Sequence, residues 1–172
     1  MKIAFLSDIH GVPDVLEAAL GRDGVKYAER IVLLGDLLYH GPRNGVPDMY
    51  DPVRVAKLLN AEKDRILAVR GNCDTEVDQM MLEFPILAPY SVLAADGKTF
   101  FLTHGHVWNE DNLPPLASGS VLCHGHTHIP LLRETSFGVT IFNPGSLALQ
   151  KGGSARSYGI WDGERLAHET LQ

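Results

Sequence analysis

Five of the protein's eight histidines fall within a single stretch, Phe100–Pro130. They form two clusters, His104–His106 and His124–His128, and each cluster follows a short apolar run typical of a β-strand. Imidazole nitrogens at the ends of strands, separated by small glycines, are how a sheet presents ligands to a metal ion. A lone histidine is most often an ordinary polar residue, but this clustering favours a metal site.

Other polar side chains also come directly after apolar runs. The complete set of candidate metal ligands is Asp8, His10, Asp36, Asn72, His104, His126 and His128. Carboxylate, imidazole and amide groups without a thiolate suit Mn, Fe, Zn, Ni or Co rather than a cysteine-rich structural zinc site. Seven ligands are too many for one tetrahedral ion, and they suit two ions about 3.5–4 Å apart, as in two-metal hydrolases.

The elements that must position these residues alternate in type through the first half of the chain. Strands are predicted at Lys2–Leu6, Arg30–Leu34 and Arg65–Val69. Helices are predicted from Pro13 to Gly21, from Pro52 to about Glu62 after an Asp51 cap, and from a Thr75 capping box to about Glu83. Strand and helix in alternation indicate an α/β sheet, in which chemistry gathers at the carboxyl ends of the strands.

The second half reads as mostly β. Strands are predicted at Tyr90–Ala94, Lys98–Thr103, Val121–Cys123, Leu131–Thr135, Val139–Phe142, Ser157–Trp161 and Arg165–Thr170. Asp96-Gly97 predicts a hairpin turn, and Asn109–Ser120 is irregular. Two packed sheets with helices outside would satisfy both halves. The chain contains no repeat, linker or low-complexity segment, so one domain over residues 1–172 is expected.

A long loop interrupts the alternation at Leu37–Asp51 and carries Tyr39, His40 and Arg43. Loops of this length in compact domains are usually functional or disordered. Two interpretations stay open at this point: a solvated loop, or a rim that contacts the substrate.

Composition excludes several classes of protein. At 172 residues, with 45% hydrophobic and 21% charged residues, the chain is long enough to bury a core without disulfides. A net charge of −6 argues against an extended nucleic-acid footprint. Only two cysteines are present, and no secretory signal or membrane-spanning run is evident, so a cytoplasmic protein without membrane association is expected.

The order and spacing of the motifs resemble the calcineurin-like metallophosphoesterases. That family carries D-x-H, G-D, G-N-[H/D/C], H and G-H-x-H in this order. The corresponding segments here are Asp8–His10, Gly35-Asp36, Gly71–Asp74, His104 and Gly125–His128. Small size, Arg70–Asp74 and Asn143–Ser146 make the chain most similar to the small bacterial phosphodiesterase branch. Val12 stands where many relatives carry asparagine.

The resemblance implies an α/β (α+β) fold, a four-layer αββα sandwich of two mixed sheets flanked by helices. It also implies two divalent metal ions, manganese first, with Fe, Zn, Ni or Co as alternatives. Asp8, His10 and His128 would hold one ion, and Asn72, His104 and His126 the other. Asp36 would bridge the two.

The implied activity is a metal-dependent hydrolysis of a small phosphoester, with a diester favoured over a monoester. A hydroxide bridging the two ions would attack phosphorus in line. Asp36, Asn72, Cys73 and His104 are the expected catalytic residues. Cys73 stands where the phosphatases of the family have a histidine that protonates the leaving oxygen, and a thiol is a poorer acid partner. His106 and His124 are the alternative acids.

A second hypothesis is a metal-site scaffold for protein interaction, as in the retromer subunit that shares this fold. The intact ligand set favours the enzyme. A homodimer or homotetramer is also expected, since the apolar strands Val139–Phe142 and Ser157–Trp161 suggest area beyond a monomer's needs. His168 is expected to be solvated.

Overall fold

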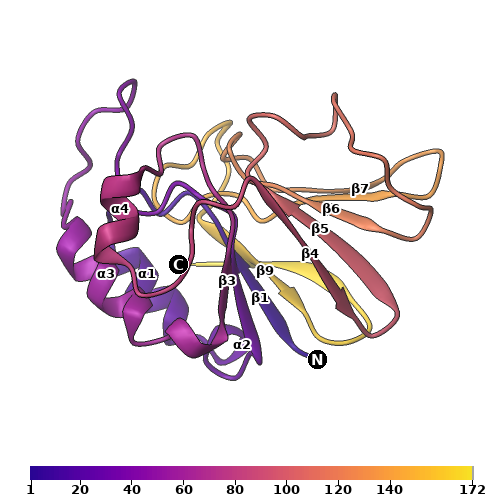
Figure 1. The fold of residues 1–172 in the computed structure, drawn as a ribbon, viewed down its shortest axis with the longest axis horizontal. Coiled ribbons are helices and arrows are strands. Elements are labelled where there is room, and N and C mark those ends of the chain that lie inside the picture. The colour runs from indigo at the N-terminus through magenta and orange to yellow at the C-terminus, as the bar shows by residue number, and fades with distance from the viewer. Residues whose placement is uncertain (172) are drawn as a thin grey trace.

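Two five-stranded sheets packed face to face form the centre of the molecule (Figure 1). The structure is a computed structural model, and it describes residues 1–171. The sandwich of two mixed sheets expected from the sequence is confirmed. The carboxyl ends of the parallel strands lie at the upper edge in Figure 1.

The first sheet has a parallel centre with an antiparallel edge. Its strands lie in the order β10-β9-β1-β2-β3, with bounds β1 Ile3–Leu6, β2 Arg30–Leu33, β3 Ile66–Ala68, β9 Ser157–Trp161 and β10 Leu166–Thr170. The strands β1, β2 and β3 are parallel, and the C-terminal hairpin of β9 and β10 pairs antiparallel with β1. Thus the two ends of the chain meet in one sheet.

The helices have the start signals that the sequence carries. Their bounds are α1 Pro13–Leu20, α2 Asp23–Lys26, α3 Pro52–Asn60, α4 Glu76–Met81 and a 3₁₀ turn, η1, at Lys63–Arg65. The Asp51 carboxylate accepts a hydrogen bond from the Arg54 N–H at 2.9 Å, and Thr75 forms the predicted capping box with Asp78. The helix α2 was not predicted, because four residues are too few to show a helical period.

The second sheet has the same plan, a parallel centre with antiparallel edges. It runs β4-β5-β6-β8-β7, with bounds β4 Tyr90–Ala95, β5 Lys98–Thr103, β6 Val121–Cys123, β7 Leu131–Glu134 and β8 Thr140–Asn143. At the predicted hairpin turn, Asp96 and Gly97 have φ values of 49° and 75°. Positive φ at both central residues defines the two-residue turn that matches the twist of the flanking strands.

Three apolar clusters form the layers of the molecule. The first lies between the first sheet and the helices and contains Leu16 and Leu59. The second fills the space between the two sheets, around Phe5, Phe100 and Phe142. The third covers the outer face of the second sheet, where the irregular segment Asn109–Ser120 and its neighbours take the place of helices. The helices of the described chain therefore lie against one sheet only (Figure 1).

The two strands expected to supply apolar surface for an oligomer, now β8 and β9, are buried within the chain itself. In β8, Ile141 and Phe142 are fully buried in the third and second clusters, and in β9, Tyr158 and Trp161 are buried in the first and second clusters. These strands therefore give no reason for an oligomer. Within residues 1–171, no helix is long and apolar enough to cross a lipid bilayer.

Another sequence interpretation, a solvated His168, is wrong. The His168 ring is partly buried and packs on the Phe142 ring with centroids 5.0 Å apart. Its Nε2 atom lies 2.7 Å from the carbonyl oxygen of Asn143. His168 thus ties the last strand to the end of β8.

At Gly159 the first sheet packs closely against the Phe142 ring of the second sheet, and this contact supplies a test of the packing. A Cβ atom there would lie 2.3 Å from the Phe142 ring, so we expect Gly159→Ala to destabilise the fold by about 2 kcal/mol. Urea denaturation measures the change. Gly45→Ala is the control, because nothing lies within 4 Å of that Cβ position. Equal stability of the two variants would contradict this description of the core.

Candidate metal centre

All seven candidate ligands lie at the same edge of the sandwich. Each follows the carboxyl end of a parallel strand: Asp8 and His10 follow β1, Asp36 follows β2, Asn72 follows β3, His104 follows β5, and His126 and His128 follow β6. The two sheets place their strand ends side by side, and residues from both halves of the chain meet there (Figure 1).

The first group of side chains contains Asp8, His10 and His128. The Nε2 atoms of His10 and His128 are 3.4 Å apart, and the Asp8 Oδ1 atom lies 3.2 Å from the His128 Nε2. The same oxygen lies 3.7 Å from the His10 Nε2. These atoms surround one small volume, as the ligands of a single ion would.

The second group contains Asn72, His104 and His126. The His104 Nε2 atom lies 3.1 Å from the Asn72 Oδ1 and 3.3 Å from the His126 Nδ1. The Asp36 Oδ2 atom lies between the groups, 3.4 Å from the His104 Nε2 and 3.7 Å from the His10 Nε2. The Asp36 carboxylate therefore lies within 4 Å of a ring nitrogen of each group.

Backbone carbonyls fix which nitrogen of each buried ring is free. The Nδ1 atom of His10 lies 2.9 Å from the Tyr39 carbonyl, that of His104 lies 2.7 Å from the Leu34 carbonyl, and that of His128 contacts the Leu149 carbonyl. A carbonyl can only accept, so each Nδ1 carries the proton and each Nε2 presents a lone pair.

These lone pairs face one another without a donor between them. The Asp8 Oδ1 atom, which is buried beside two of them, has no hydrogen-bond partner. Bringing buried acceptors together in this way costs free energy unless a positive charge lies among them. The donor set thus fits bound divalent cations, and the nitrogen and oxygen chemistry matches the ions expected from the sequence.

The pKa values of the buried groups also indicate that positive charge is favoured among these side chains. Burial disfavours the charged His104 ring, but its hydrogen bond with Asp36 and the nearby Asp8 raise the pKa of His104 to about 9. Burial also opposes the charge on Asp36, yet contact with His104 keeps the Asp36 pKa below its ordinary value. For His126, burial and the charge of His104 lower the pKa to about 4, which leaves that ring neutral and able to bind a cation.

The backbone is strained where the ligands converge. Seven non-glycine residues in the described chain have positive φ, and five of them are candidate ligands: Asp8, His10, Asp36, His126 and His128. Such conformations cost about 1–3 kcal/mol each when the surroundings enforce them. The positive φ values turn the backbone sharply at the ends of these strands, so that side chains from different strands meet.

Asp74 holds the strained turns in place, and the sequence interpretation gave it no role. Its buried carboxylate accepts hydrogen bonds from three backbone N–H groups: those of Asp36 and Leu37 at 2.9 Å, and that of Gly71 at 2.7 Å. Burial raises the pKa of Asp74, and these donors oppose that effect. The sequence signal for this role was the position of Asp74, two residues after Asn72. A carboxylate in a turn is, however, first interpreted as a local cap.

Two glycines let the turns pack against the carboxylates. A Cβ atom on Gly71 would lie 2.1 Å from the Asp36 Oδ1, and one on Gly125 would lie 1.9 Å from the Ser7 Oγ. The Ser7 hydroxyl in turn donates to the Asp8 Oδ2 at 2.6 Å. Asn143 and Ser146, expected to shape a neighbouring loop, donate to the carbonyls of Gly125 and Asp8, each at 2.8 Å.

A cavity of about 360 Å³ opens onto these groups. Its lining includes five of the candidate ligands together with Cys73, Arg43 and Lys151. Neither His106 nor His124 belongs to the lining. His106 lies beside the second group with its ring centroid 5.5 Å from that of His104, while His124 is buried with its Nε2 atom unpartnered.

Comparison with known proteins identifies the family. Residues 1–165 match the calcineurin-like phosphoesterase superfamily domain. The chain belongs to this superfamily. Phosphodiesterase YfcE from Escherichia coli strain K12 is 46% identical over 167 residues, which cover 97% of this chain and 90% of that protein. The family resemblance predicted from the motifs, including its small bacterial phosphodiesterase branch, is confirmed.

Solved structures agree with this assignment. The E. coli YfcE phosphoesterase superposes with a TM-score of 0.93 and 42% identity, with all of both chains covered. An archaeal phosphodiesterase at 23% identity, with 99% of this chain and 100% of that chain covered, and Vps29 from Cryptosporidium parvum at 15%, with 98% and 97% covered, share the fold, with TM-scores of 0.71 and 0.60. Membership of a metallophosphoesterase superfamily implies divalent metal ions, for which this calcineurin-like chain has a suitable donor set.

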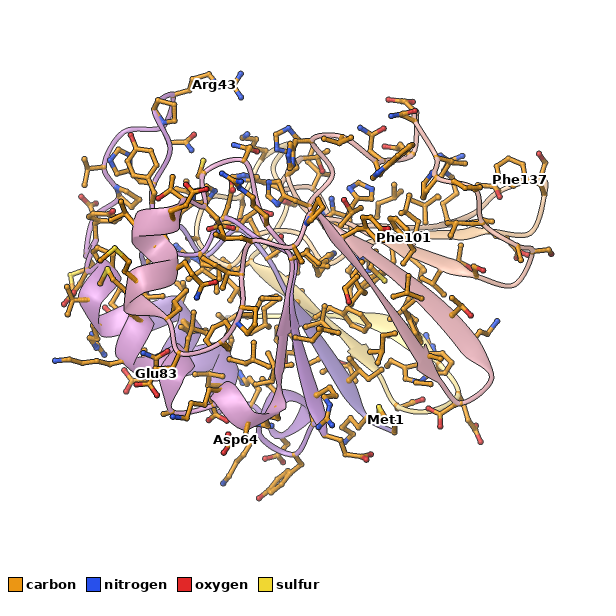
Figure 2. The ribbon with its side chains drawn as sticks, viewed as in Figure 1. Met1, Arg43, Asp64, Glu83, Phe101 and Phe137 are labelled. Carbon is orange, nitrogen blue, oxygen red and sulfur yellow. The ribbon has the colours of Figure 1, made fainter. Side chains whose placement is uncertain are left out.

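The role of Asp74 is open to a direct test. In Asp74→Asn an amide N–H₂ group replaces one acceptor oxygen and faces the backbone donors, so we expect a loss of about 1–3 kcal/mol of stability. Because the Asp36 turn also loosens, metal affinity should fall about tenfold. Denaturation and elemental analysis measure the two effects. Asp64→Asn, at the opposite end of the molecule in Figure 2, is the control and should change neither.

Proposed function

We propose that this protein is a phosphodiesterase that acts with two divalent metal ions, manganese first, on a small phosphoester. The convergence of three imidazole Nε2 lone pairs and the unpartnered Asp8 oxygen at one buried place carries the proposal. The similarity to a protein named phosphodiesterase supports a diester rather than a monoester substrate.

The seven side chains divide into two ligand sets in this proposal. Asp8, His10 and His128 hold one ion, Asn72, His104 and His126 hold the other, and Asp36 is shared. Two such ions supply Lewis acidity toward the phosphoryl oxygens and a nucleophilic water at neutral pH. Asp36 and Asn72 supply oxygen ligands, and the Leu34 carbonyl keeps the His104 ring oriented.

Among the residues that line the cavity, Cys73 is the candidate for protonating the leaving oxygen. Its N–H donates to the Asp36 Oδ1 at 2.8 Å, and its Sγ accepts from the Asn72 Nδ2 at 3.2 Å. Burial and the charge of Asp36 raise the pKa of Cys73 to about 12, so the thiol keeps its proton. A protonated thiol is a weak hydrogen-bond donor, and it gives little help to a basic leaving oxygen.

The two alternative acids lie in less suitable places. Both His106 and His124 have pKa values lowered first by burial, which leaves the rings neutral near pH 7. The buried His124 ring packs beside Asn143, whose amide Nδ2 lies 3.4 Å from its Nδ1. We therefore propose that none of Cys73, His106 and His124 is a strong acid toward the leaving oxygen, and that bound divalent ions would supply the charge stabilisation there.

The interaction scaffold remains the second candidate, and the complete donor set argues against it. Solved structures of Vps29 are similar in fold at 15% identity, which carries no statement about activity. A homodimer or homotetramer, a cytoplasmic location, and the lack of an extended nucleic-acid footprint stay predictions.

Asp36→Asn tests the dinuclear site. The amide keeps the shape of the side chain and can still accept from Cys73, but it removes the charge shared by both ligand sets. We expect metal content to fall below two ions per chain and kcat/KM to fall at least about a hundredfold, with the fold intact. Elemental analysis, a diester assay and circular dichroism measure these changes, with Asp64→Asn as the control. Two tightly held ions and normal turnover in Asp36→Asn would refute the proposed ligand sets.

Cys73→His tests the missing acid. We expect the wild-type rate to fall steeply as the leaving-group pKa rises, because the thiol does not protonate the departing oxygen. Cys73→His should recover activity on poor leaving groups and flatten that dependence, and the adjoining cavity of about 360 Å³ has room for an imidazole.

A series of aryl and alkyl diesters of graded leaving-group pKa gives the slopes. Cys73→Ser, which restores no imidazole, is the matched control and should keep the steep slope. A shallow wild-type slope that neither variant changes would show that Cys73 is a packing residue and that the acid lies elsewhere.

A further inference from the structure

The cavity beside the candidate ligands contains two residues of fixed positive charge, Arg43 and Lys151. Arg43 belongs to the long loop before α3, and Lys151 belongs to the segment between β8 and β9. Figure 2 shows Arg43 at the tip of its loop, on the same upper side of the molecule as the strand ends. Two segments more than a hundred residues apart thus each bring one cation to this wall.

Both segments are anchored to a candidate ligand. The Tyr39 carbonyl, four residues before Arg43, contacts the His10 ring, and the Leu149 carbonyl, two residues before Lys151, contacts the His128 ring. Within each segment a further hydrogen bond fixes the backbone: Asn44 donates to the His40 carbonyl at 2.7 Å, and the Ser154 hydroxyl donates to the Lys151 carbonyl at 2.8 Å. The backbone that carries the two exposed cations is therefore anchored beside the first ligand set.

Neither cation has a carboxylate partner among the described residues. Five of the fifteen lysines and arginines form ion pairs, namely Arg54, Lys63, Arg65, Arg70 and Arg133, and neither Arg43 nor Lys151 is among them. The only carboxylate in the cavity lining is that of Asp36. In a protein with a net charge of −6, this wall is a local site of uncompensated positive charge.

The charge exceeds what a simple diester requires. Two divalent cations held by Asp8 and Asp36 leave two positive charges, which one singly charged diester and one hydroxide neutralise. Arg43 and Lys151 add two more. Guanidinium binds phosphate oxygens in a bidentate manner, and an ammonium group supplies a point charge for the same anion.

We propose that Arg43 and Lys151 form a subsite for a second phosphate group, so that the substrate is a phosphodiester with an additional terminal phosphate. This inference rests on the proposed phosphodiesterase function and goes beyond it by naming the substrate class. The loop Leu37–Asp51 is then a substrate-contacting rim rather than a solvated connection.

A matched pair of substrates tests the subsite. Thymidine 5′-(p-nitrophenyl phosphate) and its 3′-phosphorylated counterpart share the nucleoside, the scissile bond and the leaving group, and differ by one phosphate. We expect wild type to favour the 3′-phosphorylated substrate in kcat/KM by at least about tenfold. Arg43→Gln and Lys151→Gln should each reduce that preference about fivefold, and the double variant should abolish it. Raising the salt concentration should weaken it in wild type.

Lys98→Gln, at the start of β5, is the control and should leave kcat/KM unchanged for both substrates. A second measurement does not depend on turnover: calorimetric titration of metal-loaded protein with thymidine 3′,5′-bisphosphate and with thymidine 5′-monophosphate. Tighter binding of the bisphosphate, reduced in both variants, supports the subsite.

The possible failures are distinguishable. Hydrolysis of both substrates with equal kcat/KM, or a preference that Arg43→Gln and Lys151→Gln leave unchanged, overturns the subsite while the phosphodiesterase function stands. Hydrolysis of neither substrate contradicts the proposed function, and the titration then decides the subsite by itself. Equal affinity for the two nucleotides overturns it.

Discussion

Buried acceptor atoms that face one another are the constraint on which the rest of this structure depends. The Nε2 atoms of His10 and His128 lie 3.4 Å apart beside an Asp8 oxygen that no donor contacts. In a low-dielectric interior such an arrangement raises the free energy of the folded chain unless cations enter it. The candidate metal ligands and the destabilising contacts are the same atoms, so the surrounding fold has to impose the arrangement.

The fold imposes it through the backbone. Three of the four candidate ligand rings, those of His10, His104 and His128, are oriented by main-chain carbonyls. The Asp74 carboxylate accepts from three N–H groups of two turns. The positive φ values at the strand ends are the conformational cost of this convergence. The inter-sheet core around Phe5, Phe100 and Phe142 offsets that cost, because it fixes the strand ends before the turns begin.

Local patterns predicted the elements and the candidate ligands, because these leave a signal in a few adjacent residues. Caps at Asp51 and Thr75 and the Asp96-Gly97 turn act within four residues, and each is present in the structure. Long-range contacts leave no such signal. The gathering of three N–H groups by Asp74, the packing of His168 on Phe142, and the nearness of Lys151 to Arg43 depend on how the sheets meet.

The same hydrogen bonds serve the candidate metal ligands and the cavity rim. A carbonyl that fixes the tautomer of His10 also fixes the base of the loop that carries Arg43, and the carbonyl opposite His128 does so for the Lys151 segment. The orientation of the His10 and His128 rings and the position of the cavity rim therefore depend on the same two backbone carbonyls, those of Tyr39 and Leu149.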